Sequence, residues 1–109
     1  MLFHLDFHVE YGASMTQQDL FGTWSREAEV ALGAKQAGVI VDLWKCAGER
    51  RVIAILDVES HDVLDDAVLS LPIMVEMGQH VNIQVTALRR YEDFAATVNR
   101  SLEAPAADG

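Results

Sequence analysis

The chain has very little cysteine, which argues against a disulfide-stabilised secreted protein and against a cysteine-ligated zinc site. Its 109 residues include a single cysteine, Cys46, so no disulfide can form within the chain and a reducing compartment is expected. No other cysteine or histidine lies near Cys46 at the spacing of zinc ligands. No run of about 18 apolar residues is present, and His4 and Asp6 stand where a signal peptide would be basic and then apolar. We therefore expect a soluble, cytoplasmic protein.

Basic residues are also scarce. Eight Lys and Arg face 17 Asp and Glu, which gives a formal net charge of -9. Nucleic-acid binding needs clustered Lys and Arg to displace counterions, and the sequence has no such cluster. An anionic substrate would need a local basic group against this overall field, and Arg50 and Arg51 are the nearest candidates. Glycine-rich phosphate loops, G-x-S-x-G and H-E-x-x-H are absent as well, so nucleotide chemistry and hydrolysis have no support.

Half of the residues are hydrophobic, which suffices for one core. Alternation of apolar and polar residues predicts half-buried strands at 1–11 and 81–88. Two runs rich in Val, Ile and Leu, joined by G-E-R, predict a hairpin. The box S-x-x-Q at 14–17 predicts a helix start, and Gly38 a helix end. The predicted strands are 1–11, 39–47, 51–58 and 81–88; the predicted helices are 14–37, one capped by Ser60 and stopped by Pro72, and 91–103.

The order strand, helix, strand, strand, helix, strand is that of the α+β ferredoxin-like fold, βαββαβ, here followed by a C-terminal helix. We expect residues 1–103 to form one domain and 104–109 a disordered tail. Two helices cover only one face of a four-stranded sheet, so we expect a second subunit to cover the other in a dimeric α+β barrel.

Glu27 occupies an unexpected place in the first predicted helix. At about 100° per residue, it falls on the apolar stripe of that helix, with Trp24 and Ala31, whereas Glu29 faces solvent. A carboxylate in an apolar setting must be paired, hydrogen-bonded or protonated, and burial raises its pKa. Such a group is suited to take and return a proton near neutral pH. A structural role, in an ion pair or a subunit contact, is the alternative.

Other polar and aromatic residues are weaker candidates. His4, Asp6 and His8 share one strand face, but the two histidines are about 13 Å apart along the strand, too far to bind one ion. A metal site would need a ligand from another strand, such as His80, and we expect none. Trp44 is expected in the core, in a subunit contact or against a substrate, and Arg50 or Arg51 is a candidate clamp for a substrate carboxylate or a solvated turn residue.

Several short stretches resemble the muconolactone delta-isomerase family in order and spacing. They are M-L-F-H at the start, Glu27, Gly38, L-W-K-C-A-G at 43–48, D-V-x-S at 57–60, Leu64 and L-P at 71–72, and the resemblance runs without a gap from residue 1 to about 73. It implies a ferredoxin-like subunit that dimerises through its sheet and often assembles into a decamer. It also implies a cofactor-free isomerase that moves a carbon-carbon double bond in a small unsaturated lactone acid, with Glu27 as the acid/base.

The chain departs from the family pattern where polar groups could hold the substrate carboxylate. Ile40 stands in place of a tryptophan, and Arg50 and Val52 in place of a tyrosine and an asparagine. These changes favour a different carbonyl compound, either bulkier or less anionic. The predicted substrate-binding residues are His4, Trp24, Trp44 and Arg51. A cofactor-independent monooxygenase or cyclase on the same scaffold, acting on polyketide-like aromatics, and a non-catalytic binding or assembly module are the alternatives.

Overall fold

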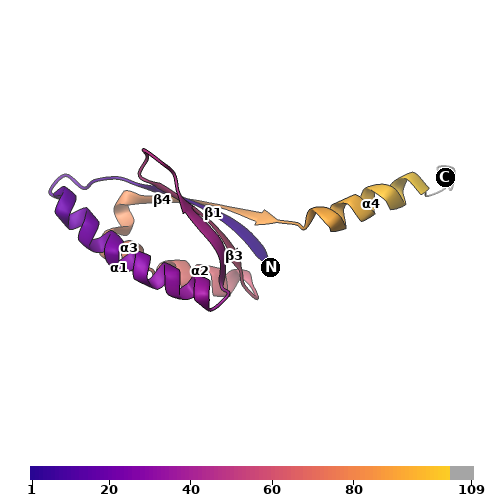
Figure 1. Ribbon diagram of the computed structural model, residues 1–109, viewed down its shortest axis with the longest axis horizontal. Coiled ribbons are helices and arrows are strands. Elements are labelled where there is room, and N and C mark those ends of the chain that lie inside the picture. Colours follow the sequence, from indigo (N-terminus) through magenta and orange to yellow (C-terminus); the bar gives the residue numbers. More distant parts are fainter. Residues whose placement is uncertain (104–109) are drawn as a thin grey trace.

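The computed structural model describes residues 1–103, which form a four-stranded antiparallel sheet with helices on one face and a helix that extends from one end (Figure 1). The predicted disorder of 104–109 lies outside the described residues. The elements are β1 (Leu2–Val9), α1 (Gln17–Gln36), β2 (Ile40–Lys45), β3 (Arg51–Asp57), α2 (His61–Leu69), α3 (Pro72–Met77), the 3-10 turn η1 (Gly78–His80), β4 (Val81–Leu88) and α4 (Tyr91–Glu103). The α+β class and the C-terminal helix predicted from the sequence are confirmed.

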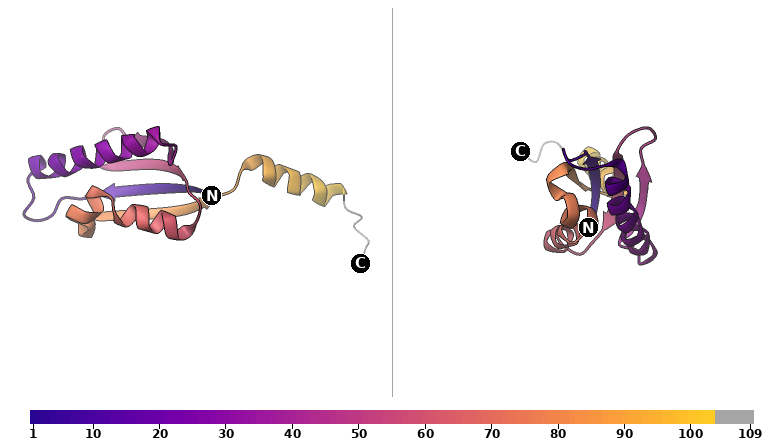
Figure 2. Two further views of the ribbon diagram at one scale, coloured as in Figure 1. Left: turned by 90° about the horizontal axis from the view of Figure 1, so that it is seen from below. Right: turned by 90° about the vertical axis from the view of Figure 1, so that its left-hand side faces the viewer.

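The strand order is β2-β3-β1-β4, and all three neighbouring pairs are antiparallel. Leu5 stands opposite Ala54 on β3 and opposite Val85 on β4. Because directly opposed residues share a face of a sheet, these residues belong to the face that α1, α2 and α3 cover (Figure 2). Asp6 and its partners Ile53 and Gln84 belong to the other face, which we call the open face.

The start of α1 differs from the prediction. Thr16, not Ser14, is the N-cap: its hydroxyl accepts a hydrogen bond from the amide of Asp19 at 3.0 Å, and the Asp19 carboxylate accepts one from the amide of Thr16 at 2.9 Å. This is a reciprocal capping box in which Asp19 is the third residue of the helix after the N-cap. The amide of Met15 instead bonds the carbonyl of Gly12 in the preceding turn. The helix ends at Gln36, and Gly38 adopts a φ of 84°, as its position after the helix predicted.

The region around Pro72 also differs from the prediction. Ser60 caps α2 as expected, accepting from the amide of Val63. However, α2 already ends at Leu69, and Pro72 opens α3 rather than stopping a helix. Proline is favoured at the first helical position, where its missing N–H leaves no bond unmade. The segment after L-P is therefore helical, and it packs against α1.

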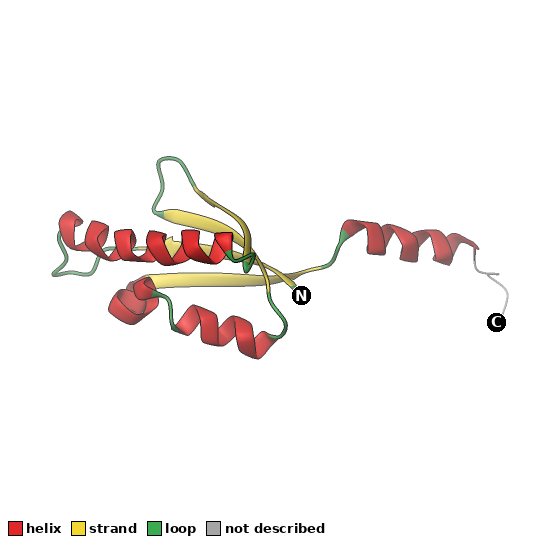
Figure 3. Cartoon of the chain, turned by 60° about the horizontal axis from the view of Figure 1, so that its bottom comes forward, coloured by secondary structure: helices red, strands yellow, loops and turns green. Residues whose placement is uncertain are grey.

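The core lies between the sheet and the helices and has two parts. The larger joins β1, β3 and the ends of α1 and α2, and it includes Phe3, Leu5, Leu56 and Leu64. The smaller joins α1 to α3 and consists of Val9, Leu20, Ile73 and Met77. Thr23, on the buried side of α1, donates a hydrogen bond to Glu76 on α3, and Arg26 forms an ion pair with the same carboxylate. The short helix is thus fixed on α1 by both apolar and polar contacts. Figure 3 shows the helices in red and the strands of the sheet in yellow.

The last helix, α4, stands away from the sheet and the other helices (Figure 1). With α4 included, the molecule measures 65 Å in its longest dimension. Its apolar residues Tyr91, Phe94, Val98 and Leu102 are all at least 40% exposed. Their spacing places them along one side of the helix. Within residues 1–103, no helix is both long and apolar enough to cross a bilayer.

Candidate active site

A cavity of about 300 Å³ lies between α1 and the helix-covered face of the sheet, and the loop between α2 and α3 closes one side of it. Its walls are almost entirely apolar. Among the residues that line it within the described chain, Glu27 is the one acidic side chain and Lys45 the one basic side chain. The other lining residues are Leu5, Phe7, Val9, Trp24, Ala28, Ala31, Leu32, Ala34, Val39, Ile40, Leu43, Trp44, Val52, Ala54, Leu56, Ala67, Val68, Leu71 and Ile73.

Glu27 is half-buried on the cavity side of α1, as the helical periodicity predicted, while Glu29 is exposed. Its Oε1 accepts a hydrogen bond of 3.1 Å from the backbone amide of Ile73 in the first turn of α3. Its Oε2 has no hydrogen-bond partner within residues 1–103. Every fully buried side-chain oxygen in that range has a partner, so Oε2 is not fully buried. Oε2 is therefore accessible. One oxygen of the carboxylate is thus held by α3, and the other is unbonded.

Two opposing effects act on the Glu27 carboxyl. Burial against the apolar wall raises its pKa from the ordinary value, because the charged form loses hydration. The hydrogen bond from Ile73 favours the charged form and lowers the pKa, but by less, so the net direction is upward. A carboxyl group held in this way is suited to alternate between its charged and neutral forms near the pH at which an enzyme works.

The two tryptophans border the cavity in different ways. Trp24 lies one turn before Glu27 on α1 and is half-buried at the cavity wall. Trp44 reaches the cavity margin on β2, but it stands opposite Ile53, so its ring shares the open face and its side chain is 54% exposed. The structure thus brings Trp24 together with Glu27, and it places most of Trp44 where a second subunit could cover it.

His4 and Arg51 do not join Glu27 within one chain, in contrast to the sequence-based expectation. His4 stands opposite Ile55, and Arg51 opposite His8, so both belong to the open face. Arg51 donates hydrogen bonds of 2.9 and 2.6 Å to the two carboxylate oxygens of Asp6 and covers that residue. This bidentate pair lowers the pKa of Asp6. Consecutive strand residues point to opposite faces, so the strand position of Arg51 decides its partner.

The acidic and histidine residues of the open face do not form a metal centre within one chain. His4, Asp6 and His8 share that face as predicted, but Asp6 is engaged by Arg51 and by His8 Nε2 at 3.2 Å. His80, the suggested further ligand, lies against Gly12 beyond the sheet: a Cβ at Gly12 would come within 2.5 Å of its Nε2. In residues 1–103, no group of three potential His, Cys, Asp or Glu ligands lies close enough to hold an ion.

The residue that sequence reasoning missed is Ile73, whose amide orients Glu27. It was missed because α3 was not predicted, although Pro72 at a first helical position was a usable indication of a helix start.

The sheet order, the two covering helices and the cavity under α1 define a ferredoxin-like α+β protein with one half-buried carboxyl group in an apolar site. Residues 1–93 match the family model of muconolactone delta-isomerase, and the chain belongs to that family. It is 31% identical over 91 residues to muconolactone delta-isomerase 2 of Acinetobacter lwoffii, a match that covers 84% of this chain and 91% of the relative. A crystal structure of muconolactone isomerase superposes with a TM-score of 0.70 at 28% identity, covering 83% of this chain and 90% of that one.

These matches support an isomerase-type function. They also place α4 almost wholly beyond the family region, because the family match ends at residue 93 and α4 continues to Glu103.

Proposed function

We propose that this chain is a cofactor-free isomerase that shifts a carbon-carbon double bond in a small unsaturated lactone or a related carbonyl compound. Glu27 acts as the acid/base. The observation that carries the proposal is the state of its carboxylate: Oε1 is held by Ile73, Oε2 is free, and the surrounding wall is apolar. Family membership supports the reaction class.

The proton transfers balance without any other reactant. The ionised Glu27 removes a proton from a carbon that the conjugated carbonyl group acidifies, and the electron pair of the C–H bond moves towards the carbonyl oxygen. The neutral Glu27 then returns a proton two carbons away, the double bond is left in its new position, and the carboxylate is regenerated. The raised pKa of Glu27 favours the first step, because it makes the carboxylate a stronger base, and the neutral carboxyl that forms holds the proton until it is returned.

The test compares Glu27→Gln with Glu29→Gln, which makes the same change at an exposed position of the same helix. Turnover is assayed on muconolactone and a panel of unsaturated lactones, and solvent deuterium incorporation into each compound is followed by proton NMR. Loss of both turnover and exchange in Glu27→Gln, with Glu29→Gln near the parent, is the expected result. Exchange at the parent rate in a folded Glu27→Gln contradicts the proposal.

The alternative on this scaffold is a monooxygenase or cyclase, and an oxygen electrode distinguishes the first of these. The isomerisation consumes no oxygen, so turnover without oxygen uptake and with a product of unchanged mass is expected.

We also propose that the protein self-associates through the open face. Trp44 is exposed there, Ile53 and Ile55 are only half-buried, and the Asp6–Arg51 pair lies among them. A second sheet would cover this apolar surface and remove the paired charges from solvent.

A further inference from the structure

The helix α4 exposes an apolar stripe, formed by Tyr91, Phe94, Val98 and Leu102, that no other part of the described chain covers. These four residues lie within about 80° of one another around the helix, and each is at least 40% exposed. Within residues 1–103, α4 has no extended contact with another element. A helix of 13 residues is only marginally stable in water on its own. The stripe therefore requires a partner surface.

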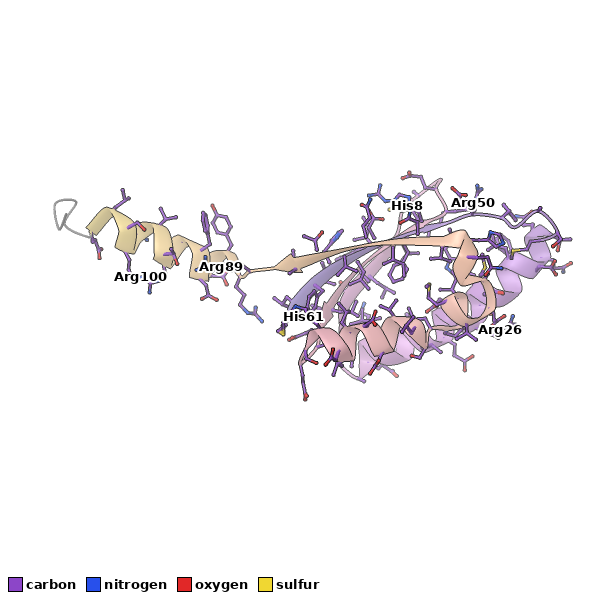
Figure 4. The ribbon with its side chains drawn as sticks, turned by 180° about the vertical axis from the view of Figure 1, so that it is seen from behind. His8, Arg26, Arg50, His61, Arg89 and Arg100 are labelled. Carbon is purple, nitrogen blue, oxygen red and sulfur yellow. The ribbon has the colours of Figure 1, made fainter. Side chains whose placement is uncertain are left out.

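A second uncovered apolar surface is a recess of about 620 Å³ between the start of α1 and the hairpin that joins β2 to β3. Its apolar lining consists of Tyr11, Leu20, Phe21 and Trp24. Phe21 is 57% exposed and Tyr11 38%, so two aromatic rings of this lining face solvent. Figure 4 shows Arg50, which also lines the recess, toward one end of the molecule and Arg100 of α4 at the other. The two uncovered surfaces of one chain thus lie far apart.

The recess carries an excess of positive charge. Two cations line it, Lys45 and Arg50, against one acid, Glu49. Neither cation forms an ion pair within residues 1–103. Arg50 is nonetheless fixed in place, because its guanidinium lies 4.9 Å from the centre of the Tyr11 ring and its Nε donates to the carbonyl of Val9 at 3.3 Å. An apolar surface with a basic rim is thus present in a chain whose net charge is -9.

The charges of α4 complement those of the recess. The helix contains three acids and one base. A rotation of about 100° per residue places Glu92 and Glu103 on the same flank of the apolar stripe, and Arg100 on the side opposite the stripe. Neither glutamate forms an ion pair within the described part of the chain. The stripe therefore has an acidic flank, which suits a partner surface with a basic rim.

The stripe cannot reach the recess of its own chain. The amide of Val9, at the end of β1, donates to the carbonyl of Arg50, and Val9 stands opposite Val81, the first residue of β4. The recess therefore lies at the end of the sheet where β4 begins, whereas α4 follows the other end of β4 after two residues. The eight residues of β4 span about 26 Å. A helix of about 20 Å that folded back along β4 would leave Tyr91 at the far end of the sheet.

We propose that α4 of each chain lies in the recess of a second copy of this chain, with its stripe against the apolar lining and its acidic flank toward the two cations. The exchange is reciprocal, so both copies use the same pair of surfaces. Each partner of a stable dimer buries about 800 Å², more than one side of a 13-residue helix provides, so α4 reinforces the open-face contact. The inference does not rest on the isomerase activity, and it concerns a helix almost wholly beyond the family match, which ends at residue 93.

A disulfide between two full-length chains locates α4 directly. One chain carries Val98→Cys in the stripe and the other Phe21→Cys in the recess, each with Cys46→Ser so that no further thiol is present. After co-expression and mild oxidation, the two chains are expected to form a covalent dimer on denaturing electrophoresis. The matched control replaces Val98→Cys by Ala96→Cys, an exposed position on the other side of α4. The stripe cysteine should react at least about tenfold faster than this control, because docking raises its effective concentration at the recess.

Three results of the same experiment overturn the inference. A covalent dimer formed by Val98→Cys chains alone shows that α4 lies against α4 of the other copy. A chain that carries both Val98→Cys and Phe21→Cys and oxidises to a monomer shows that α4 folds back into its own recess. Equal rates for Val98→Cys and Ala96→Cys show that the two chains met by chance collision.

The strength of association gives a second measurement, made by sedimentation velocity over a dilution series. Phe94→Glu places a charge in the stripe and is expected to raise the dissociation constant about tenfold, whereas Ala96→Glu, on the other side of α4, should leave it within about twofold. Glu92→Lys and Lys45→Glu should each weaken association, and the chain with both changes should recover part of the loss. An unchanged constant in Phe94→Glu, or losses that add in the double variant, overturn the inference.

Failure of this inference is distinguishable from failure of the open-face contact. The disulfide between Val98→Cys and Phe21→Cys reports the position of α4, whatever covers the open face. If that disulfide forms while Ile53→Glu, which charges the open face, keeps the mass of the parent, the open-face contact fails and the exchange of α4 stands. If Ile53→Glu dissociates and the parent background gives no disulfide, the exchange fails and the open-face contact stands.

Discussion

The carboxylate of Glu27 on α1 accepts a hydrogen bond from the backbone amide of Ile73 at the start of α3, 46 residues further along the chain. The first amides of a helix have no partner within the helix, and Leu71, the N-cap residue of α3, makes no side-chain cap bond. Glu27 therefore has two roles that the structure joins: it supplies an acceptor to the start of α3, and α3 in turn fixes the orientation of the proposed acid/base.

The capping role predicts a difference between two substitutions at position 27. In Glu27→Gln the amide oxygen still accepts from Ile73, whereas Glu27→Leu leaves that amide without a partner. We expect Glu27→Leu to be less stable than Glu27→Gln by about 1 kcal/mol, measured by urea unfolding. Amide hydrogen exchange gives a local readout: the Ile73 amide should exchange faster in Glu27→Leu only. Equal protection of that amide in both variants contradicts the capping role, and both proteins are expected to lack turnover.

The raised pKa of Glu27 predicts a pH dependence of stability with a definite sign. The folded protein holds the Glu27 proton more tightly than the unfolded chain does, so between the two pKa values the folded state binds more protons. The contribution of Glu27 to the free energy of unfolding must then fall as the pH rises from the ordinary value of 4.5 through the higher pKa of the folded state. Glu27→Gln has no such proton and should lack this decrease, so the stability difference in its favour should grow across the window.

The same shift predicts the acidic limb of the activity profile. Because the ionised carboxylate removes the first proton, kcat/KM should rise with pH through the Glu27 pKa of the free enzyme, with a midpoint above 4.5. Urea unfolding of the parent and Glu27→Gln at a series of pH values, together with kcat/KM over the same range, checks both statements. Parallel stability curves for the two proteins, or a midpoint below 4.5, count against a raised pKa.

Much of this site could be predicted from the sequence, because it depends on local periodicity. The position of Glu27 among the apolar residues of α1 follows from a rotation of about 100° per residue, and the strand order follows from the sequence of elements. The register of the hairpin was harder to predict. Arg50 and Arg51 are adjacent in sequence, yet β3 begins at Arg51, so Arg51 reaches Asp6 while Arg50 stays in the loop beside Tyr11.

Contacts between distant segments could not be predicted. Pro72 is compatible both with a helix end and with a helix start, and only the packing of Ile73 and Met77 against Leu20 decides for the second. The N-cap of α1 was misassigned for a related reason. Two overlapping boxes, one from Ser14 and one from Thr16, compete in the sequence, and the turn between Gly12 and Met15 uses up the earlier residues.

The proposed self-association predicts that a charge at the centre of the open face separates the subunits. Ile53 stands between Trp44 on β2 and Asp6 on β1, next to the paired charges of Asp6 and Arg51. A glutamate there would be desolvated against the partner sheet and would add a negative charge beside Asp6, so association is disfavoured both by burial and by repulsion. Val75→Glu makes a comparable change on α3, at a side chain that is 71% exposed.

Sedimentation velocity and light scattering measure the outcome. The parent and Val75→Glu are expected to have the mass of a dimer or a larger assembly, and Ile53→Glu a mass closer to one chain, with circular dichroism showing that its secondary structure is kept. Because the cavity lies between α1 and the other face of the sheet, a dissociated but folded Ile53→Glu should still bind an uncharged apolar fluorescent probe such as N-phenylnaphthylamine. A monomeric parent, or an Ile53→Glu variant with the mass of the parent, shows that the open face is not the contact between subunits.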